Sequence, residues 1–301
     1  MFKIVDRMKK RFNRNSYIYK MCRAIYKAPS LLFSCHGYTK QYVFFPIEAF
    51  CRKHHLWPFY DKNAKLLESL KDKHKGQRCF VIATGPSLTL NDVEMLRDEV
   101  TIGVNSIYRL YDKTDFRPTY YTVLDEEAQK NSESNIDKYK VLSTAGTFMN
   151  NLRRIQRPDV YYIPLCYQNH WFKLGDNRFD YSKNLKYCTD LLWGFYDKYT
   201  VTNVAIDLAI YMGCEEIYLI GVDCTWNGPK IHFDESDNSP VLSHDTAYHT
   251  QKAMMTGYRF MEKETKKRGI HIFNATRGGM LEEFDRVDFD SIINIDGGQE
   301  K

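Results

Sequence analysis

Phe80-Val81-Ile82-Ala83-Thr84-Gly85-Pro86-Ser87-Leu88 is an apolar run that stops at a Gly-Pro-Ser turn. A buried strand that ends in a glycine turn and leads into a helix places backbone N–H groups and a helix N-terminus at the carboxyl edge of a sheet, where phosphates bind. The stretch has neither the Gly-Lys-Ser/Thr of a P-loop nor the Gly-x-Gly-x-x-Gly of a dinucleotide site. It therefore indicates a nucleotide site of another kind, although a plain strand-turn-helix would show the same pattern.

From residue 78 onward, apolar runs alternate with helical segments. The pattern predicts strands at 79–83, 100–104, 119–124, 160–164, 216–222 and 270–273, and helices at about 91–97, 106–112, 202–212 and 246–268. Four or more alternations with continuous apolar strands indicate a mainly parallel sheet covered on both faces. We predict an α/β, Rossmann-like domain over residues 76–301, in which the aromatic and irregular segment 130–200 forms a lid or an acceptor-facing insertion.

Residues 1–75 are predicted to form a helical N-terminal appendage. Residues 1–30 hold nine Lys and Arg against one Asp, a local charge of +8, whereas the whole chain carries only +5. Phe2, Val5, Met8 and Phe12 recur at helical spacing among the basic residues. A basic, aromatic terminal segment favours an anionic membrane surface over nucleic acid as its partner. The alternative is a helix packed on the main domain with a solvated basic face.

The eight cysteines form no Cys-x-x-Cys pair, and several lie inside apolar runs. They are typical of buried thiols in a reducing compartment. No apolar run reaches the roughly 18 residues that a membrane span needs, and the N-terminus lacks the apolar core of a signal peptide. We therefore expect a cytoplasmic protein, with peripheral attachment to the inner face of the membrane as a further expectation.

Polar side chains follow the predicted strands, where open α/β sheets place their sites. They include Thr84 to Ser87, then Asn105 and Ser106, then Asp125 with Glu126 and Glu127. The acidic group could bind a ribose, an amine or a divalent ion, or it could cap a helix and fill its first turn. Asp223, after the strand at 216–222, could hold a sugar hydroxyl or fix its own loop.

His249, at the start of a long helix, is the best candidate for a general base, because an imidazole can take a proton from an attacking hydroxyl near neutral pH. His244 and His232 are rivals, and a structural role for His249 is the alternative. The intervals between these histidines and Asp245 match no compact zinc motif, so we expect no metal there. Asn274, Thr276 and Arg277 follow the last strand and suit a base edge or a phosphate.

These residues resemble a known group, the bacterial lipooligosaccharide sialyltransferases and the related domain family that includes the MptE-like 6-hydroxymethylpterin pyrophosphokinases and flagellin-glycosylation proteins. The resemblance covers residues 78–285. Its most specific part is Gly-Val-Asp-x-x-x-Asn-Gly at 221–228, followed by Phe233-Asp234 and His249. The opening Gly-Pro-Ser-Leu and Asn105 also match.

The resemblance implies a Rossmann-like variant of the GT-A fold and an inverting, metal-free displacement with no cofactor. Gly85, Ser87 and Asn105 would bind the nucleotide of a CMP-sugar, and His249 would deprotonate the acceptor. The chain departs from the sialyltransferases where two leaving-group tyrosines fall at Thr225 and Ile231, and where Thr84 replaces an asparagine. Either Trp226, His232 or Arg277 stabilises the leaving group instead, or the donor differs.

Three functions follow from these patterns. The leading hypothesis is a glycosyltransferase that moves a sugar from a nucleotide-sugar to a glycan or lipid-linked acceptor in surface polysaccharide synthesis. The second is Mg²⁺-dependent pyrophosphoryl transfer from ATP to a hydroxymethylpterin-like alcohol, with Asp125, Glu126 and Asp223 holding the metal. The third is a nucleotide-binding protein without catalytic activity. The sequence does not indicate an oligomeric state.

Overall fold

The computed structural model describes residues 43–135, 138, 141–150, 159–166, 180–183, 185–225, 232–234 and 244–294. The chain divides into two compact units, residues 1–47 and 48–301. Helix α3 (Phe45–Lys53) spans this division. The predicted anchor within residues 1–42 lies outside the described residues. None of the helices among the described residues has the length and apolar character that crossing a membrane requires.

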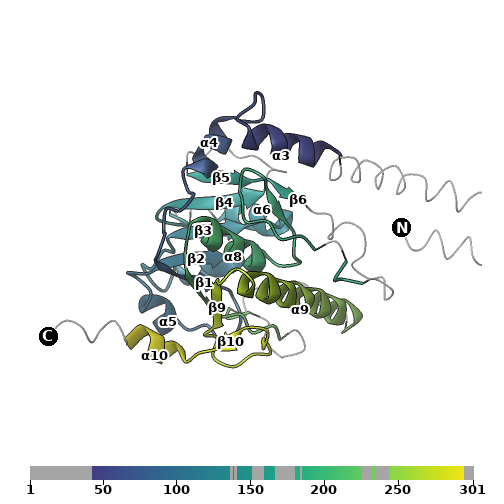
Figure 1. The fold of residues 1–301 in the computed structure, drawn as a ribbon. Coiled ribbons are helices and arrows are strands. Elements are labelled where there is room, and N and C mark those ends of the chain that lie inside the picture. The colour runs from purple at the N-terminus through teal and green to yellow at the C-terminus, as the bar shows by residue number, and fades with distance from the viewer. Residues whose placement is uncertain are drawn as a thin grey trace, which may run out of the picture. The chain divides into compact units, whose positions relative to one another are not determined.

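A parallel sheet of eight strands forms the centre of the unit at 48–301 (Figure 1). The strand order is β10-β9-β8-β1-β2-β3-β4-β5. From β1 the chain adds strands on one side as far as β5, and it then returns to the other side of β1 with β8. The strand order therefore reverses between β1 and β8, which is where open α/β sheets bind ligands. The strands are β1 (Arg78–Ile82), β2 (Val100–Val104), β3 (Tyr120–Val123), β4 (Gly146–Asn150), β5 (Val160–Ile163), β8 (Glu216–Ile220), β9 (His271–Asn274) and β10 (Asp285–Arg286).

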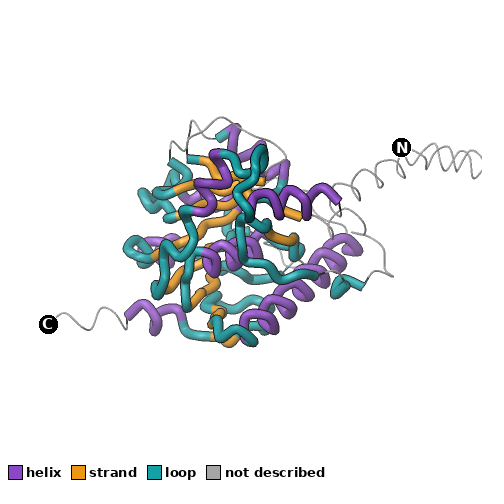
Figure 2. Tube along the Cα trace, turned by 45° about the horizontal axis from the view of Figure 1, so that its top comes forward, coloured by secondary structure: helices purple, strands orange, loops and turns teal. Residues whose placement is uncertain are grey.

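Helices cover both faces of this sheet, as the tube in Figure 2 also shows. The side chains of α4, α8 and α9 pack on one face, and those of α5, η2, α6 and α10 pack on the other. A pair of two-residue strands, β6 (Leu165–Cys166) and β7 (Phe195–Tyr196), forms a separate small sheet. The helices are α4 (Lys62–Glu68), α5 (Leu90–Glu94), the 3-10 helix η2 (Asn105–Leu110), α6 (Glu126–Ser134), α8 (Val201–Tyr211), α9 (His244–Lys266) and α10 (Phe289–Asn294).

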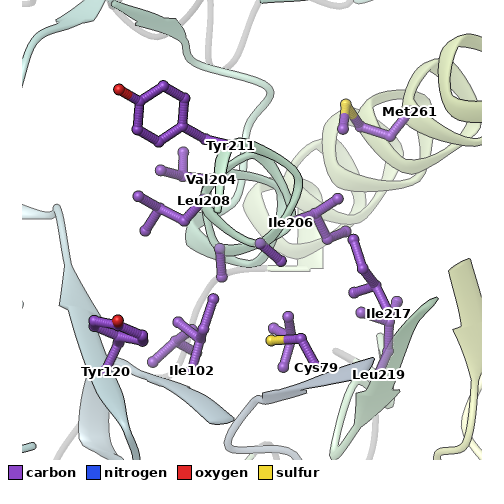
Figure 3. Close-up of a cluster of buried hydrophobic side chains, with 14 of the residues drawn as sticks. Cys79, Ile102, Tyr120, Val204, Ile206, Leu208, Tyr211, Ile217, Leu219 and Met261 are labelled. Atoms are coloured by element: carbon purple, nitrogen blue, oxygen red, sulfur yellow. The ribbon is translucent and has the colours of Figure 1, made fainter. Parts of the chain in front are cut away.

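Helix α8 is the centre of one core layer. It begins at the N-cap Thr200, whose side chain accepts a hydrogen bond from the Thr202 N–H. Its apolar side chains, among them Val204 and Leu208, lie over the strands β1, β2, β3 and β8, and Met261 of α9 packs beside them (Figure 3). Nine of its eleven residues are buried, which explains why the segment is apolar on almost all sides.

The predicted α/β class and parallel sheet are confirmed, and six of the eight strands lie where the sequence places them. Strand β4 was not predicted, and the helix expected at 106–112 is a short 3-10 helix at 105–110. The range 130–200, expected as a lid or insertion, contains β4 and β5 of the central sheet. Part of that range therefore belongs to the scaffold.

Residues 48–75 also differ from the expected appendage, because they belong to the same compact unit as the sheet. Leu67 and Leu70 are buried in the core layer of α8. The N–H groups of Asp72 and His74 donate to the carbonyls of Tyr211 and Met212 at the end of α8. The packing of the chain therefore places the unit boundary after Ile47, well before residue 75.

Candidate functional site

The turn after β1 meets the loop after β8 at the point where the strand order reverses. The Gly85 N–H donates to the Gly221 carbonyl at 2.8 Å, and the Ala83 N–H donates to the Ile220 carbonyl at 2.9 Å. A Cβ atom at Gly85 would lie 1.9 Å from Asp223 Oδ2 and 2.5 Å from the Gly221 oxygen. Only glycine fits there, so the turn and the loop form one tightly packed unit.

Asp223 fixes the turn. Its carboxylate is 7% exposed and accepts hydrogen bonds from the Ser87 hydroxyl at 2.8 Å and from the Ser87 N–H at 3.4 Å. Burial raises the pKa of this carboxyl, and the bonds from Ser87 offset part of that rise. Of the two roles left open by the sequence, the structure shows the loop-fixing contact, while a catalytic role for Asp223 stays a prediction.

The turn differs from a phosphate cradle in one respect. The N–H groups of Gly85, Ser87 and Leu88 all donate to protein acceptors. The following helix α5 starts with a reciprocal capping box between Thr89 and Asp92, which uses two of the N–H groups at that helix end. The N–H groups of Gly85, Ser87 and Leu88 are therefore already bound within the protein, and nucleotide contact at Thr84, Gly85, Pro86 and Ser87 stays a prediction.

Asn105 follows the neighbouring strand β2 and has a strained backbone. Its φ is +46°, in the left-handed region that few residues other than glycine adopt, and its carbonyl accepts the Tyr121 hydroxyl at 2.5 Å. The Asn105 Oδ1 atom is buried and finds no hydrogen-bond partner within the part of the chain that is described. Such strain and such an unsatisfied acceptor are typical of ligand sites. Ser106 follows as the second residue of η2.

Asp125, after β3, caps helix α6. Its Oδ1 atom accepts the Ala128 N–H at 3.0 Å, and its carbonyl accepts the Gln129 N–H. This contact is the helix-capping alternative that the sequence left open. Glu126 is the first residue of α6, and its side chain lies outside the described atoms.

The residues after β9 support the loops around them. Asn274 and Thr276 are buried, and the Thr276 hydroxyl accepts the Val222 N–H at 3.1 Å. The Asn274 side chain bridges the loop by donating to the Leu281 carbonyl at 2.7 Å and accepting the Thr276 N–H at 3.0 Å. Both side chains hold the loops together, and their predicted contact with a nucleotide is untested.

Arg277 is bound to two carboxylates. Its guanidinium forms ion pairs with Asp92 at 3.2 Å and with Asp290 at 2.6 Å, and it lies over the Phe289 ring. The hydrogen bonds that the guanidinium donates to Asp290 raise its pKa further above the ordinary value. In the described structure Arg277 joins α5 to α10, a role that the sequence analysis did not foresee.

His232 reaches the turn from the loop expected to stabilise the leaving group. Its Nδ1 atom lies 3.3 Å from the Thr84 hydroxyl, and the Phe233 N–H donates to the Thr84 carbonyl at 3.0 Å. Thr225 is half-buried after β8, whereas Trp226 lies outside the described residues. Of the two candidates for that role that are described, His232 and Arg277, the structure shows His232 in contact with the turn.

His249 lies in the second turn of α9 and is 5% exposed. Its Nδ1 atom is 3.1 Å from the Tyr181 hydroxyl oxygen. Two residues further on, Gln251 donates to the Cys224 carbonyl at 3.2 Å, which ties this part of α9 to the Asp223 loop. Tyr181 was not predicted from the sequence, because a single tyrosine in an aromatic segment gives no signal.

The site offers neither a thiolate nor a cluster of metal ligands among its described residues. Burial raises the pKa of the Cys224 thiol to about 12, so this cysteine is protonated at neutral pH. Across the described ranges, no three His, Cys, Asp or Glu side chains gather as metal ligands do. The described part of the site offers imidazoles and hydrogen-bond acceptors.

Three solved structures are similar to this chain. The Maf glycosyltransferase from Magnetospirillum magneticum AMB-1 shares 16% identity with a TM-score of 0.45, and the match covers 75% of this chain and 38% of that one. The sialyltransferase CstII from Campylobacter jejuni in complex with CMP shares 16% identity with a TM-score of 0.44, over 71% of this chain and 85% of that one. A complex of the sialyltransferase CST-II with a trisaccharide acceptor and CMP shares 15% identity with a TM-score of 0.41. That match covers 70% of this chain and 86% of the other.

At these identities the similarities carry no information about substrate. This chain spans little more than a third of the length of the Magnetospirillum protein. A search of curated proteins found no match. Residues 55–229 match the profile of the family described as 6-hydroxymethylpterin diphosphokinase MptE-like. Because the match covers more than half of the 301 residues, the chain belongs to this MptE-like family.

Proposed function

We propose that this protein is an inverting glycosyltransferase that moves a sugar from a nucleotide-sugar, with a CMP-sugar favoured, to a glycan or lipid-linked acceptor. The proposal rests on the environment of Asn105. Its buried and unsatisfied Oδ1 atom and strained backbone lie at the carboxyl edge of the sheet, beside the strand whose turn Asp223 holds. An unsatisfied acceptor there suits an amino or hydroxyl group of a nucleoside.

His249 is the proposed general base. The acceptor hydroxyl attacks the anomeric carbon as its proton passes to the imidazole, and the bond from that carbon to the phosphate oxygen breaks. The electron pair leaves with the nucleotide, so the configuration at the anomeric carbon inverts and no covalent intermediate forms. General-base catalysis of this kind contributes about 10²–10⁴-fold, and positioning supplies much of the rest.

His232 is the proposed partner of the leaving phosphate. Its contact with Thr84 places an imidazole at the turn, where it could donate to an oxygen on which negative charge develops. Arg277 is the weaker candidate, because Asp92 and Asp290 already bind its guanidinium. In this scheme the reaction needs no metal ion.

Family membership favours a second candidate, diphosphate transfer from ATP to a hydroxymethylpterin-like alcohol. That reaction is expected to use Mg²⁺. The described carboxylates give this reaction little support, because Asp125 caps α6, Asp223 accepts the bonds of Ser87, and no three His, Cys, Asp or Glu side chains among the described residues gather as metal ligands do.

A ligand panel tests the proposal. CMP, CDP, UDP, GDP and ATP, each with Mg²⁺ and with EDTA, are added to the purified protein, and unfolding is followed by thermal shift and binding by calorimetry. A ligand at a hundred times its Kd adds about 2.7 kcal/mol of stability. We expect CMP to bind more tightly than the other nucleotides when EDTA removes metal ions. Asn105→Ala should lose this binding, whereas Asn91→Ala, a change at an exposed residue, should retain it.

Each alternative has its own outcome. A Mg²⁺-dependent preference for ATP overturns the proposal in favour of diphosphate transfer. CMP binding without sugar transfer to any acceptor of a glycan panel favours a nucleotide-binding protein without activity. If His249→Ala leaves transfer unchanged, the assignment of the general base is wrong.

A further inference from the structure

The proposed base has a tyrosine partner on a different part of the chain. The Tyr181 hydroxyl lies 3.1 Å from His249 Nδ1, and the two ring centroids are 6.4 Å apart. Both side chains are almost fully buried, at 3% and 5% exposure. Because an imidazole–hydroxyl contact inside the protein is shielded from competing water, it can fix both the orientation and the tautomer of the ring.

Tyr181 is itself held in place. Asp180 accepts hydrogen bonds from the Ser182 N–H at 3.0 Å and from its hydroxyl at 2.6 Å, which shapes the turn that carries Tyr181. Tyr199 donates its hydroxyl to the Tyr181 carbonyl at 2.9 Å, and the two rings meet edge to face at 88°. Tyr199 adopts a left-handed φ of +71° and donates its N–H to Asp197.

The direction of the hydrogen bond to His249 decides what its other nitrogen can do. If Tyr181 donates to Nδ1, the proton of the neutral ring is on Nε2, which then cannot accept another. If Nδ1–H donates to the Tyr181 oxygen, Nε2 carries a lone pair and can accept a proton. A tyrosine hydroxyl can accept one bond while donating another, so the second arrangement is open to it.

We propose that Tyr181 is the positioning residue of His249, accepting its Nδ1–H so that Nε2 acts as the base. The inference rests on the proposed function for the role of Nε2. The tautomer itself does not depend on any reaction, because it is a property of the free protein. Tyr199 completes the arrangement by holding the backbone of Tyr181.

Nitrogen-15 spectra of the full-length protein labelled at histidine test this directly. His249→Gln identifies the His249 signals, and wild type is compared with Tyr181→Phe, which keeps the ring but lacks the hydroxyl. The matched control is Tyr111→Phe, which removes a buried hydroxyl that donates to the Leu142 carbonyl on the other core layer. We expect the Nδ1–H tautomer in wild type and in the control, and its loss in Tyr181→Phe.

Kinetics provide a second readout. Since a general base contributes ~10²–10⁴-fold, we expect Tyr181→Phe to lower kcat by about 10-fold with the KM for the donor within about twofold of wild type. An Nε2–H tautomer in wild type, or an unchanged tautomer in Tyr181→Phe, overturns the inference. If the tautomer changes as expected while His249→Gln retains full transfer, Tyr181 still positions His249, and the assignment of His249 as the general base is what fails.

Discussion

Lys198 and Asp207 form an ion pair with both side chains fully buried. Lys198 also donates to the Tyr196 carbonyl at 3.2 Å, and its own carbonyl accepts the Asn203 side chain at 2.9 Å. The pair therefore joins β7 to the first turns of α8. Asp207 Oδ1 has no hydrogen-bond partner among the described residues, so the carboxylate is only partly compensated for its loss of water.

Burial raises the pKa of Asp207 from about 3.8 to about 6, although Lys198 opposes the rise. Because the folded pKa lies above the unfolded one, the contribution of this group to stability is complete below about pH 3.8 and is lost as the pH rises through about 6. Lys198→Met removes the opposing charge, so we expect the pKa of Asp207 to rise further. The stability that Asp207 contributes should then be lost over a range that extends to higher pH.

Urea denaturation at pH 5 and pH 8 measures this effect. We expect Lys198→Met to cost clearly more free energy of unfolding at pH 8, where breaking a buried pair costs about 3–5 kcal/mol, than at pH 5. Lys186→Met, which changes an exposed lysine over the Tyr196 ring, should show no such difference. Equal costs for Lys198→Met at the two pH values would contradict the assignment of Asp207.

At the scale of elements, helix α4 protects the edge of the sheet. Asn63 donates to the Tyr162 carbonyl at 2.9 Å and accepts the Tyr162 N–H at 2.8 Å, so its amide pairs with β5 much as a further strand would. Asp61 fixes the start of the helix by accepting the Ala64 N–H at 2.9 Å. An edge strand covered in this way is not open to pairing with another chain.

Removing this amide should loosen the edge. Because a broken bond that leaves a backbone group unsatisfied costs about 1–3 kcal/mol, we expect Asn63→Ala to destabilise the protein by that order and to speed hydrogen exchange of the Tyr162 N–H. Asn63→Asp retains the acceptor and should protect that N–H better than alanine does. Unchanged exchange in Asn63→Ala would show that the side chain does not protect the edge.

The sequence predicted the elements that contain continuous apolar runs, such as β1, β8 and α8. It missed β4, Gly146-Thr147-Phe148-Met149-Asn150, because only two of its five residues are large and apolar. It also could not predict β6 and β7, since two-residue strands depend on tertiary contacts and have no period of their own. The Gly-Pro-Ser turn after β1, in contrast, is a local pattern, and the sequence predicted it.

At the scale of the whole molecule, the sequence predicted that the strand-end residues lie at one edge of the sheet, because parallel strands share one carboxyl edge. It could not tell which of them face a ligand. Asp125, Thr276 and Arg277 have the right chemistry, but the structure engages each in a hydrogen bond or an ion pair within the protein. The Tyr181–His249 contact joins residues 68 positions apart, and only the fold reveals such a pair.

The charge distribution of the whole chain leads to the last prediction. Residues 1–30 carry +8, so the remaining residues carry about −3, and an anionic bilayer should attract one end of the molecule only. Each basic residue near such a surface contributes about 1 kcal/mol, so replacing Lys9, Lys10 and Arg11 with Gln should weaken binding by about 100-fold. Co-sedimentation of the full-length protein with phosphatidylserine vesicles measures this, and phosphatidylcholine vesicles are the control.

Binding should also fall steeply between 0.05 and 0.5 M salt, because a shorter Debye length screens the attraction. Equal binding to both kinds of vesicle, insensitive to salt, would contradict attachment through these charges, and an acidic protein partner would then become the better explanation of the basic segment.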